Sequence, residues 1–375
     1  MRHPKKVLNN LTKHSNQSDY KYERLYRILF NEEMFYVAYQ KLSKKQGNST
    51  KGSDGKNIDG TSLKRIERLI KELKDESYQP QPSRRTYIPK KNGKMRPLGI
   101  PAFRDKLVQE VMRMVLESLY EGQFSYQSHG FRPGKSCHTA LIYLQNNFIG
   151  TKWFIEGDIK GFFDNINHDV LIKILQERIK DDRFIRLIRK FLNAGYLEDW
   201  ILHRTYSGTV QGGIISPILA NIYLDKLDKY MEEYIQNFDK GNRRLRNPEA
   251  RVLEGRKMTV TKNLKKEKDE TKRTALQKEI REIEKKRVLI PYGVEMDDTY
   301  KRLKYVRYAD DFLIGAIGSK EDCKEIKENI KQFLAEKLKL ELSDEKTLIT
   351  HGTKPAKFLG FDVYVRDTNL PKRDK

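Results

Sequence analysis

The chain has 375 residues, 37% of them hydrophobic, which is enough to build more than one packed unit around a substantial core. Its formal net charge of +23, from 75 Lys and Arg against 52 Asp and Glu, favours a polyanionic partner, with nucleic acid ahead of an anionic membrane. A disulfide framework and a cysteine-rich zinc module are excluded because Cys137 and Cys323 are the only cysteines, and the longest apolar run, 212–224, is too short to span a bilayer.

The N-terminal region is polar and basic, and it lacks the apolar stretch of a secretory signal. We expect residues 1–30 to form a basic extension and the protein to reside in the cytoplasm of a bacterium. Residues 46–60 have a loop composition rich in Gly, Ser, Asn and Lys. The helical spacing of apolar residues from Leu63 to Leu73 predicts a helix after this loop.

A turn signal at Asn92-Gly93 separates two potential strands and predicts a basic hairpin. We expect its cations, which include Lys90, Lys91 and Arg96, to point toward phosphate groups. Between residues 107 and 119 the apolar positions repeat with a helical period, which predicts a helix that packs in the core.

A strand followed by a helix is predicted near the middle of the chain. Alternation over Trp153 to Ile159 indicates a strand, with Asp158 near its end. Asn167 is a candidate N-cap for a helix whose apolar stripe runs from Val170 to Ile179.

Residues 236–291 differ from their surroundings because they are rich in Lys, Arg and Glu. Their apolar stripe is thin and consists of Leu264, Leu276, Ile280 and Ile283. This pattern predicts an exposed, basic helical insertion. It is equally typical of a solvated helix stabilised by ion pairs such as Glu282 with Lys286, so both interpretations stay open.

The most informative stretch is Tyr308-Ala309-Asp310-Asp311, two adjacent carboxylates between the apolar segments 303–306 and 312–317. Apolar, β-prone residues on both sides predict a hairpin whose tip carries the two charges. A helix over 322–340 and a final strand complete a βαββαβ unit that starts with the strand of Asp158. The predicted fold class is α+β, with an antiparallel sheet whose helices cover one face only.

In such a unit the end of the first strand and the tip of the central hairpin are neighbours, so Asp158, Asp310 and Asp311 are expected to share a site. Three carboxylates can hold two magnesium ions. Two metal ions serve phosphoryl transfer, because one activates the attacking hydroxyl while the other stabilises the leaving oxygen. The pattern therefore predicts nucleotidyl transfer of the polymerase type.

Several segments resemble the motifs of reverse transcriptases, in the order found in that family. Residues 154–166 resemble motif A, and Tyr308 to Asp311 resemble motif C. Further resemblances are those of Gln211-Gly212-Gly213 with Ser216-Pro217 to motif B, of 129–134 to the second conserved block, of 88–101 to the first, and of 358–361 to the primer-side element. These versions are most similar to those of group II intron-encoded reverse transcriptases, the maturases, over about residues 31–365.

The resemblance implies a metal site and a nucleotide site. Asp158, Asp310 and Asp311 would bind two Mg²⁺ ions, with the main-chain carbonyl of Ile159 as an additional ligand. The residues implied to bind the incoming deoxynucleotide are Lys90, Lys91, Arg96, Phe163, Gln211 and Lys346. Among them, Gln211 would lie beside the base or sugar.

The resemblance also implies roles for the other nucleotide-binding residues. Arg96 and either Lys90 or Lys91 would hold the triphosphate, because a forked guanidinium and an ammonium neutralise the charge that develops on the leaving group. Phe163 would crowd a ribose 2′-hydroxyl and so select deoxynucleotides. Lys346 resembles a lysine that protonates the departing pyrophosphate.

The implied architecture is a right-hand polymerase with fingers over 31–147 and a palm over 148–375, the palm carrying the insertion at 236–291. Family members usually continue into a thumb or maturase domain and into DNA-binding and endonuclease modules, none of which is expected within this chain. Whether the chain polymerises without them stays open.

The sequence thus predicts an RNA-directed DNA polymerase of a group II intron that also binds intron RNA to assist splicing and retrohoming. Its expected partners are group II intron RNA, an RNA template with a DNA primer, and dNTPs, while homodimerisation is left open. Alternatives are a splicing maturase that keeps the polymerase fold without using it and a retron-type reverse transcriptase. An RNA-dependent RNA polymerase is disfavoured by Phe163 and by the Tyr-Ala before the carboxylate pair.

Overall fold

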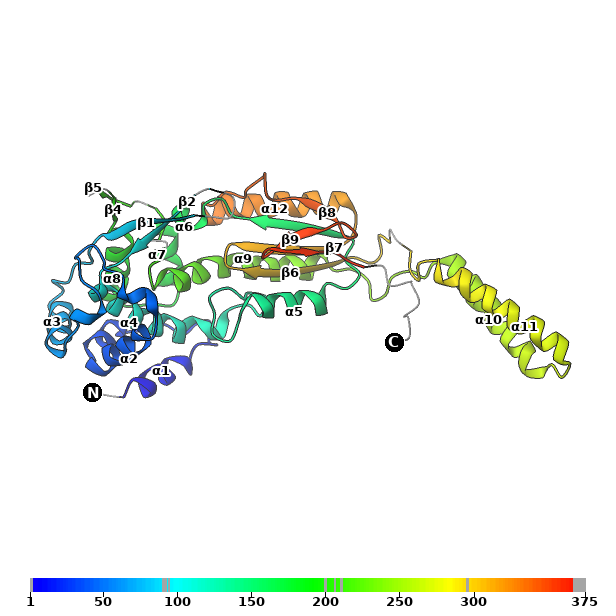
Figure 1. The fold of residues 1–375 in the computed structure, drawn as a ribbon, viewed down its shortest axis with the longest axis horizontal. Coiled ribbons are helices and arrows are strands. Elements are labelled where there is room, and N and C mark those ends of the chain that lie inside the picture. Colours follow the sequence, from blue (N-terminus) through cyan, green and yellow to red (C-terminus); the bar gives the residue numbers. More distant parts are fainter. Residues whose placement is uncertain are drawn as a thin grey trace.

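A four-stranded antiparallel sheet forms the centre of the structure (Figure 1). The computed structural model describes residues 3–89, 93, 95–198, 201–205, 207–209, 212–294 and 297–366. The strands are β3 (Trp153–Asp158), β6 (Arg302–Tyr308), β7 (Asp311–Ile317) and β8 (Ile349–His351), in the order β6-β7-β3-β8. The first strand therefore lies between the third and the fourth, as in a βαββαβ unit, and the predicted α+β fold class is confirmed.

Two long helices, α9 (Ser216–Phe238) and α12 (Lys320–Leu338), cover one face of this sheet. Because side chains alternate along a strand, every second residue faces these helices. Ile155, Tyr305 and Phe312 are such residues, and all three are buried with the apolar side chains of α9 and α12.

The helix predicted after Asn167 is present as α7 (His168–Gln176), and the Asn167 side chain caps it by accepting the backbone N–H groups of Asp169 and Val170 at 3.1 and 3.0 Å. It packs chiefly against α8 (Asp182–Leu192) and α9. α7 is therefore not the helix that covers the sheet in the first strand-helix-strand connection of the βαββαβ unit. α9 takes that place, because its apolar N-terminal half is buried between the sheet and the remaining helices.

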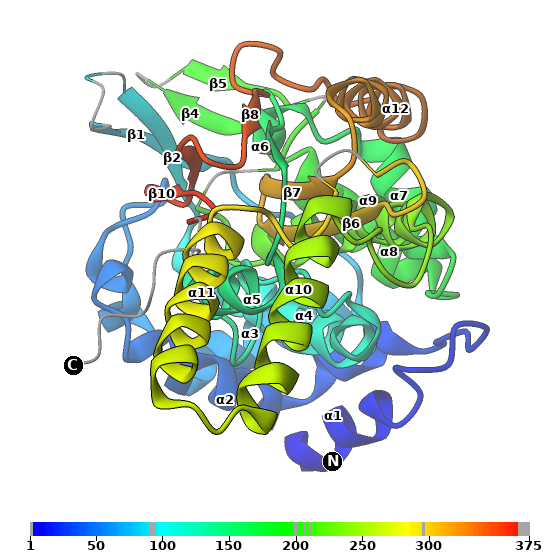
Figure 2. The ribbon, with the colours of Figure 1, turned by 90° about the vertical axis from the view of Figure 1, so that its right-hand side faces the viewer.

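The opposite face of the sheet is also partly covered by a helix. Side chains of α5 (Cys137–Asn147) and the following Phe148 pack in a second apolar cluster with Phe154, Val306 and Leu313, which point away from α9. Figure 2 shows α9 and α12 on one side of β6 and β7 and α5 on the other. The expectation that helices cover one face only therefore needs correction.

A second sheet and further helices make up the N-terminal part of the molecule. The sheet contains β1 (Ser83–Pro89), β2 (Met95–Ile100), β4 (Tyr196–Glu198) and β5 (Ile201–His203), in the order β2-β1-β4-β5, and the helices are α1 (Pro4–Thr12), α2 (Glu32–Ser43), α3 (Leu63–Lys74), α4 (Phe103–Tyr120) and the short α6 (Phe162–Asn165). One buried apolar cluster extends from Tyr22 to Leu342 and joins these elements to the central sheet. The division into fingers and palm stays a prediction.

Helices α10 (Pro248–Lys266) and α11 (Glu270–Val288) pair with each other and project from one end of the molecule (Figure 1). Their ion pairs run from one helix to the other, as between Arg256 and Glu279 at 2.8 Å and between Lys257 and Glu284 at 2.7 Å. The buried apolar side chains of the two helices are few, namely Ala250, Val260 and Ile283.

A buried ion pair between Arg307 of β6 and Asp228 of α9 fastens this helix to the sheet. Both side chains are fully buried. The Nε and Nη2 atoms of Arg307 donate to Oδ1 and Oδ2 of Asp228 at 2.7 and 2.6 Å, and the hydroxyl of Tyr305 donates to Oδ1 at 2.8 Å. The remaining N–H groups of Arg307 reach the Ser128 hydroxyl and the Ala309 carbonyl, both at 2.8 Å, and the Asn221 side chain at 3.4 Å.

We expect Asp228→Asn to reduce the free energy of unfolding by about 3 kcal/mol or more, because it leaves the Arg307 guanidinium buried without its counter-charge. The measurement is urea unfolding. The matched control is Glu341→Gln, which breaks the exposed pair with Lys160 and should cost less than about 1 kcal/mol. Equal losses in the two variants would show that the buried pair has no special role in stability.

Candidate active site

The three predicted carboxylates meet at one end of the central sheet. Asp158 lies opposite Asp311 in the pairing of β3 with β7, and Tyr308 pairs with Asp311 to close a two-residue turn over Ala309 and Asp310. Ala309 has a φ of 55°, in the left-handed region that two-residue hairpin turns require. The site therefore contains two carboxylates from the hairpin and one from the neighbouring strand.

The charges in this site are only partly balanced. Burial, followed by the nearby charges of Asp310 and Asp158, raises the pKa of Asp311 to about 6. Burial and the charge of Asp158 also raise the pKa of Asp310, against the opposing effect of Arg96 and Lys346. The Nζ atom of Lys346 lies 2.9 Å from Oδ2 of Asp158. The carboxylate cluster is thus short of positive charge.

The chemistry of these donors fits a divalent cation, because hard cations take carboxylate and carbonyl oxygens and lower the repulsion among them. Across the described part of the chain, however, no three His, Cys, Asp or Glu side chains converge as a ready metal-binding group. Asp158 is oriented toward Lys346 instead. The ammonium group here supplies part of the neutralisation that a cation would supply.

A cavity of about 500 Å³ opens beside Asp158 and Asp311. Its opposite wall is the hairpin of β9 (Ala356–Phe358) and β10 (Phe361–Val363), where the predicted primer-side element lies. The carboxylates therefore face a space large enough for part of a polynucleotide.

Three of the predicted nucleotide-binding residues, Arg96, Phe163 and Lys346, lie around the same end of the sheet. Arg96 is exposed on β2, and its charge lowers the pKa of Asp310. Phe163 is almost buried in α6, five residues after Asp158, and the side chain of Ile159 is buried beneath the strand end. Predicted residues outside the described part of the chain are Lys90, Lys91 and Gln211.

The motif B loop is held against the N-terminal sheet. Gly212 has a φ of 107°, and a Cβ atom there would lie 2.4 Å from the carbonyl oxygen of Gly99, so only glycine permits this approach. The buried Gln109 side chain accepts the backbone N–H of Ile214 at 2.8 Å. Gln109 was not predicted as a site residue, because its helical pattern indicates only core packing.

The loop at 127–131 supports the carboxylate turn, and sequence reasoning missed this. The backbone N–H groups of His129 and Arg307 each donate across the contact, to the carbonyls of Arg307 and Gln127, both at 2.9 Å. A Cβ atom on Gly130 would lie 2.3 Å from the backbone nitrogen of Ala309. The one available signal was Arg307 itself, a charged residue at an inward position of a strand whose other inward positions are Leu303 and Tyr305.

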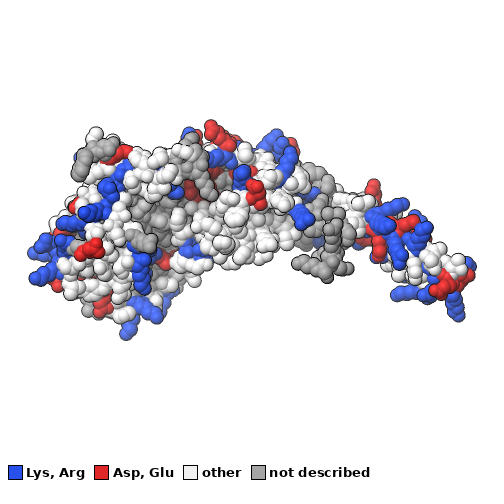
Figure 3. Space-filling view, in the orientation of Figure 1, with Lys and Arg blue, Asp and Glu red and all other residues white. Residues whose placement is uncertain are grey.

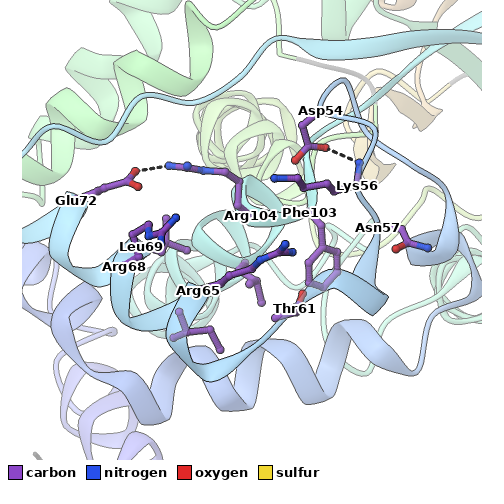
Figure 4. A pocket seen from close by; sticks show the side chains of 12 residues that line it. Asp54, Lys56, Asn57, Thr61, Arg65, Arg68, Leu69, Glu72, Phe103 and Arg104 are labelled. Carbon is purple, nitrogen blue, oxygen red and sulfur yellow. Dashed lines mark hydrogen bonds and ion pairs between the residues drawn. The ribbon is translucent and has the colours of Figure 1, made fainter.

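A second, cation-lined cavity of about 130 Å³ lies between α3, the start of α4 and the loop before α3 (Figure 4). Its charged residues are Lys56, Arg65, Arg68 and Arg104 against Asp54 and Glu72. Arg104 forms an ion pair with Glu72, so the balance of the lining is positive.

This fold and this arrangement of carboxylates define a right-hand polymerase. The chain belongs to the reverse transcriptase (RNA-dependent DNA polymerase) family, whose model matches residues 88–244 and 274–363. Members of this family are divalent-metal-dependent polymerases.

The resemblance to group II intron-encoded proteins is confirmed by similar curated proteins. The chain is 51% identical over 369 residues to the group II intron-encoded protein LtrA of Lactococcus lactis, covering 98% of this chain and 61% of that protein. It is 40% identical to the putative COX1/OXI3 intron 1 protein of Saccharomyces cerevisiae (91% and 39% covered) and 34% identical to protein YkfC of Escherichia coli (90% and 82% covered). The chain thus spans less than two thirds of the length of the first two relatives.

Among the described residues, no helix combines the length and the apolar character needed to cross a membrane.

Protonation of His129, in the loop at 127–131, makes the stability of the protein depend on pH. Its side chain is 1% exposed, with Nδ1 2.9 Å from the Thr139 hydroxyl. Burial, reinforced by the charges of Lys135 and Arg132, lowers the pKa of His129 from 6.5 to about 4. Between these two values the unfolded chain binds a proton that the folded chain does not, so stability falls as the pH falls through this window.

Between pH 6.5 and pH 4.5, we expect the free energy of unfolding to decline less in His129→Asn than in the wild-type protein. Asparagine can keep a hydrogen bond to Thr139, and it does not titrate. The measurement is urea unfolding at both pH values. His138→Asn, which changes an exposed histidine on α5, should keep the wild-type slope. Identical slopes in all three proteins would contradict the assignment.

Proposed function

We propose that this protein is the RNA-directed DNA polymerase of a group II intron, which also binds the intron RNA to assist splicing and retrohoming. The main support is the position of Asp158 opposite Asp311, with Asp310 in the adjoining turn. Similarity to intron-encoded proteins favours this proposal over a retron-type enzyme. The intact carboxylate set favours it over a maturase that does not polymerise.

Asp158, Asp310 and Asp311, with the carbonyl of Ile159, would hold two Mg²⁺ ions. When bound, these ions would lower the pKa of the primer 3′-hydroxyl and neutralise charge on the leaving pyrophosphate. The carboxylates are suited to this role because they are partly buried and repel one another, as the raised pKa values of Asp310 and Asp311 indicate.

Other side chains would bind and orient the dNTP. Arg96, with Lys90 or Lys91, would hold the triphosphate, since a guanidinium fork matches phosphate geometry. Lys346, whose ammonium group lies 2.9 Å from Asp158, would stand beside the metal site and donate a proton to the departing pyrophosphate.

The remaining two residues would recognise the sugar and the base. Phe163 would exclude a 2′-hydroxyl from the sugar position. Gln211 would lie beside the base or sugar.

Two basic regions would bind RNA. Figure 3 shows Lys and Arg side chains gathered over the end of the molecule that carries α3 and over the α10–α11 hairpin. The cation-lined cavity of Figure 4 lies in the first region and would receive a backbone phosphate. In this proposal, residues 31–147 are the fingers, 148–375 the palm, and 236–291 a basic insertion.

We expect Asp310→Asn in the full-length protein to reduce cDNA synthesis about a thousandfold or more, because metal-assisted stabilisation of the transition state contributes several kcal/mol. Primer extension on an RNA template with dNTPs and Mg²⁺ measures this. Intron RNA binding and splicing should be unchanged, and Asp169→Asn, at an exposed surface position, is the control. Retained synthesis would refute the metal assignment.

We expect Arg68→Ala to weaken intron RNA binding and to reduce the slope of log affinity against log salt by about 1, because one phosphate contact is lost. Filter binding from low to high salt provides both values. The control is Lys337→Ala on α12, away from the basic cavity. An unchanged slope would show that this cavity does not contact RNA phosphates.

A further inference from the structure

Phe131 adopts a conformation that its side chain does not favour. Its φ is 57°, in the left-handed region that bulky residues rarely occupy, and its side chain is 50% exposed. An exposed aromatic ring in strained backbone contributes little to folding. Strained residues of this kind gather at functional sites, and this one lies in the second conserved block, to which the proposed function gives no role.

The neighbours of Phe131 hold this conformation in place. On one side, the Gly130 carbonyl accepts a hydrogen bond from Asn221 at 2.8 Å, and Gly130 itself packs against Ala309. On the other side, Arg132 donates to the carbonyls of Ser125 and Ser128 at 2.6 and 2.8 Å. The backbone that carries the Phe131 ring is therefore held in place by these hydrogen bonds.

The ring of Phe131 contacts two aromatic residues of the candidate site. Its centroid lies 6.4 Å from that of Phe163 with an interplanar angle of 76°, an edge-to-face arrangement. It also lies 6.4 Å from the ring of Tyr308, at 43°. Phe131 thus bridges the residue proposed to face the sugar and the tyrosine that precedes the carboxylate pair.

We propose that Phe131 is a positioning residue that holds the Phe163 ring toward the incoming sugar and so strengthens selection against ribonucleotides. This inference rests on the proposed function. A steric barrier discriminates only as far as it resists displacement. Phe162 supports the Phe163 ring from one side at a centroid distance of 5.2 Å, and a 2′-hydroxyl pushes the Phe163 ring aside more easily when the support of Phe131 is removed. An edge-to-face contact changes such an equilibrium by about two- to tenfold.

The test uses Phe131→Gly in the full-length protein, because glycine accepts the positive φ while the whole benzyl side chain is removed. Single-nucleotide extension with dNTP and with the matching rNTP gives the ratio of the two kcat/KM values. We expect this ratio to fall about fivefold, chiefly through a lower KM for the rNTP, with an unchanged thermal unfolding midpoint. Phe131→Tyr should restore the ratio.

Two further variants separate positioning from a general structural effect. Tyr126→Ala removes an exposed aromatic ring from the same loop region. This ring makes edge-to-face contacts with His129 and Tyr143, and its removal should leave the ratio unchanged. In a Phe163→Val background, Phe131→Gly should change the ratio no further, because the residue through which it acts is gone.

The outcomes distinguish this inference from the proposed function. If the wild-type protein incorporates no dNTP, the proposed function fails and this inference falls with it. If the wild-type protein polymerises DNA but Phe131→Gly lowers both kcat/KM values in equal proportion, or acts equally in the Phe163→Val background, the inference alone is overturned.

Discussion

The geometry of the candidate site depends on the buried guanidinium of Arg307. All five of its N–H groups have acceptors, which lie on α9, in the loop around Ser128 and in the carboxylate turn itself. A buried guanidinium has no contact with water, so all its N–H groups must be hydrogen-bonded to protein acceptors. Each of these segments is therefore held at a fixed distance from the others. One side chain therefore joins three parts of the chain that are remote in sequence.

In this arrangement, the residue that fixes the shape of the carboxylate turn is different from the carboxylates that would bind a metal. Asp310 and Asp311 repel each other and Asp158, and burial adds to that cost, as their raised pKa values show. The turn keeps its shape because the Ala309 carbonyl is bonded to Arg307 and not because its own charges are compatible. Compensating charge comes only in part from distant segments, through Arg96 and Lys346, so the carboxylate cluster still favours a cation.

Local patterns predicted the parts of the site that depend on local physics. Alternation indicated β3 and the hairpin, and the carboxylates at their ends followed from the βαββαβ order. Patterns did not predict which surfaces pack together: α9 rather than α7 covers the sheet, and α5 covers its other face. The spacing of apolar residues indicates that one face of a helix or strand is buried, but it does not indicate which element covers that face. The hydrogen-bond partners of Arg307 could not be predicted either, because hydrogen bonds between segments distant in sequence produce no periodic pattern in it.

The β2 strand that carries Arg96 and the motif B loop, which together form the proposed nucleotide site, are mechanically coupled. Gly212 packs on the backbone of β2, which carries Arg96, and Gln109 holds the same loop from α4. A continuous apolar core links these elements to the central sheet. Arg96, which we propose to bind the triphosphate, therefore cannot shift independently of the motif B loop. A close-packed interior transmits small displacements, so a bulky side chain at Gly212 would move Arg96 relative to Asp310 without altering either residue.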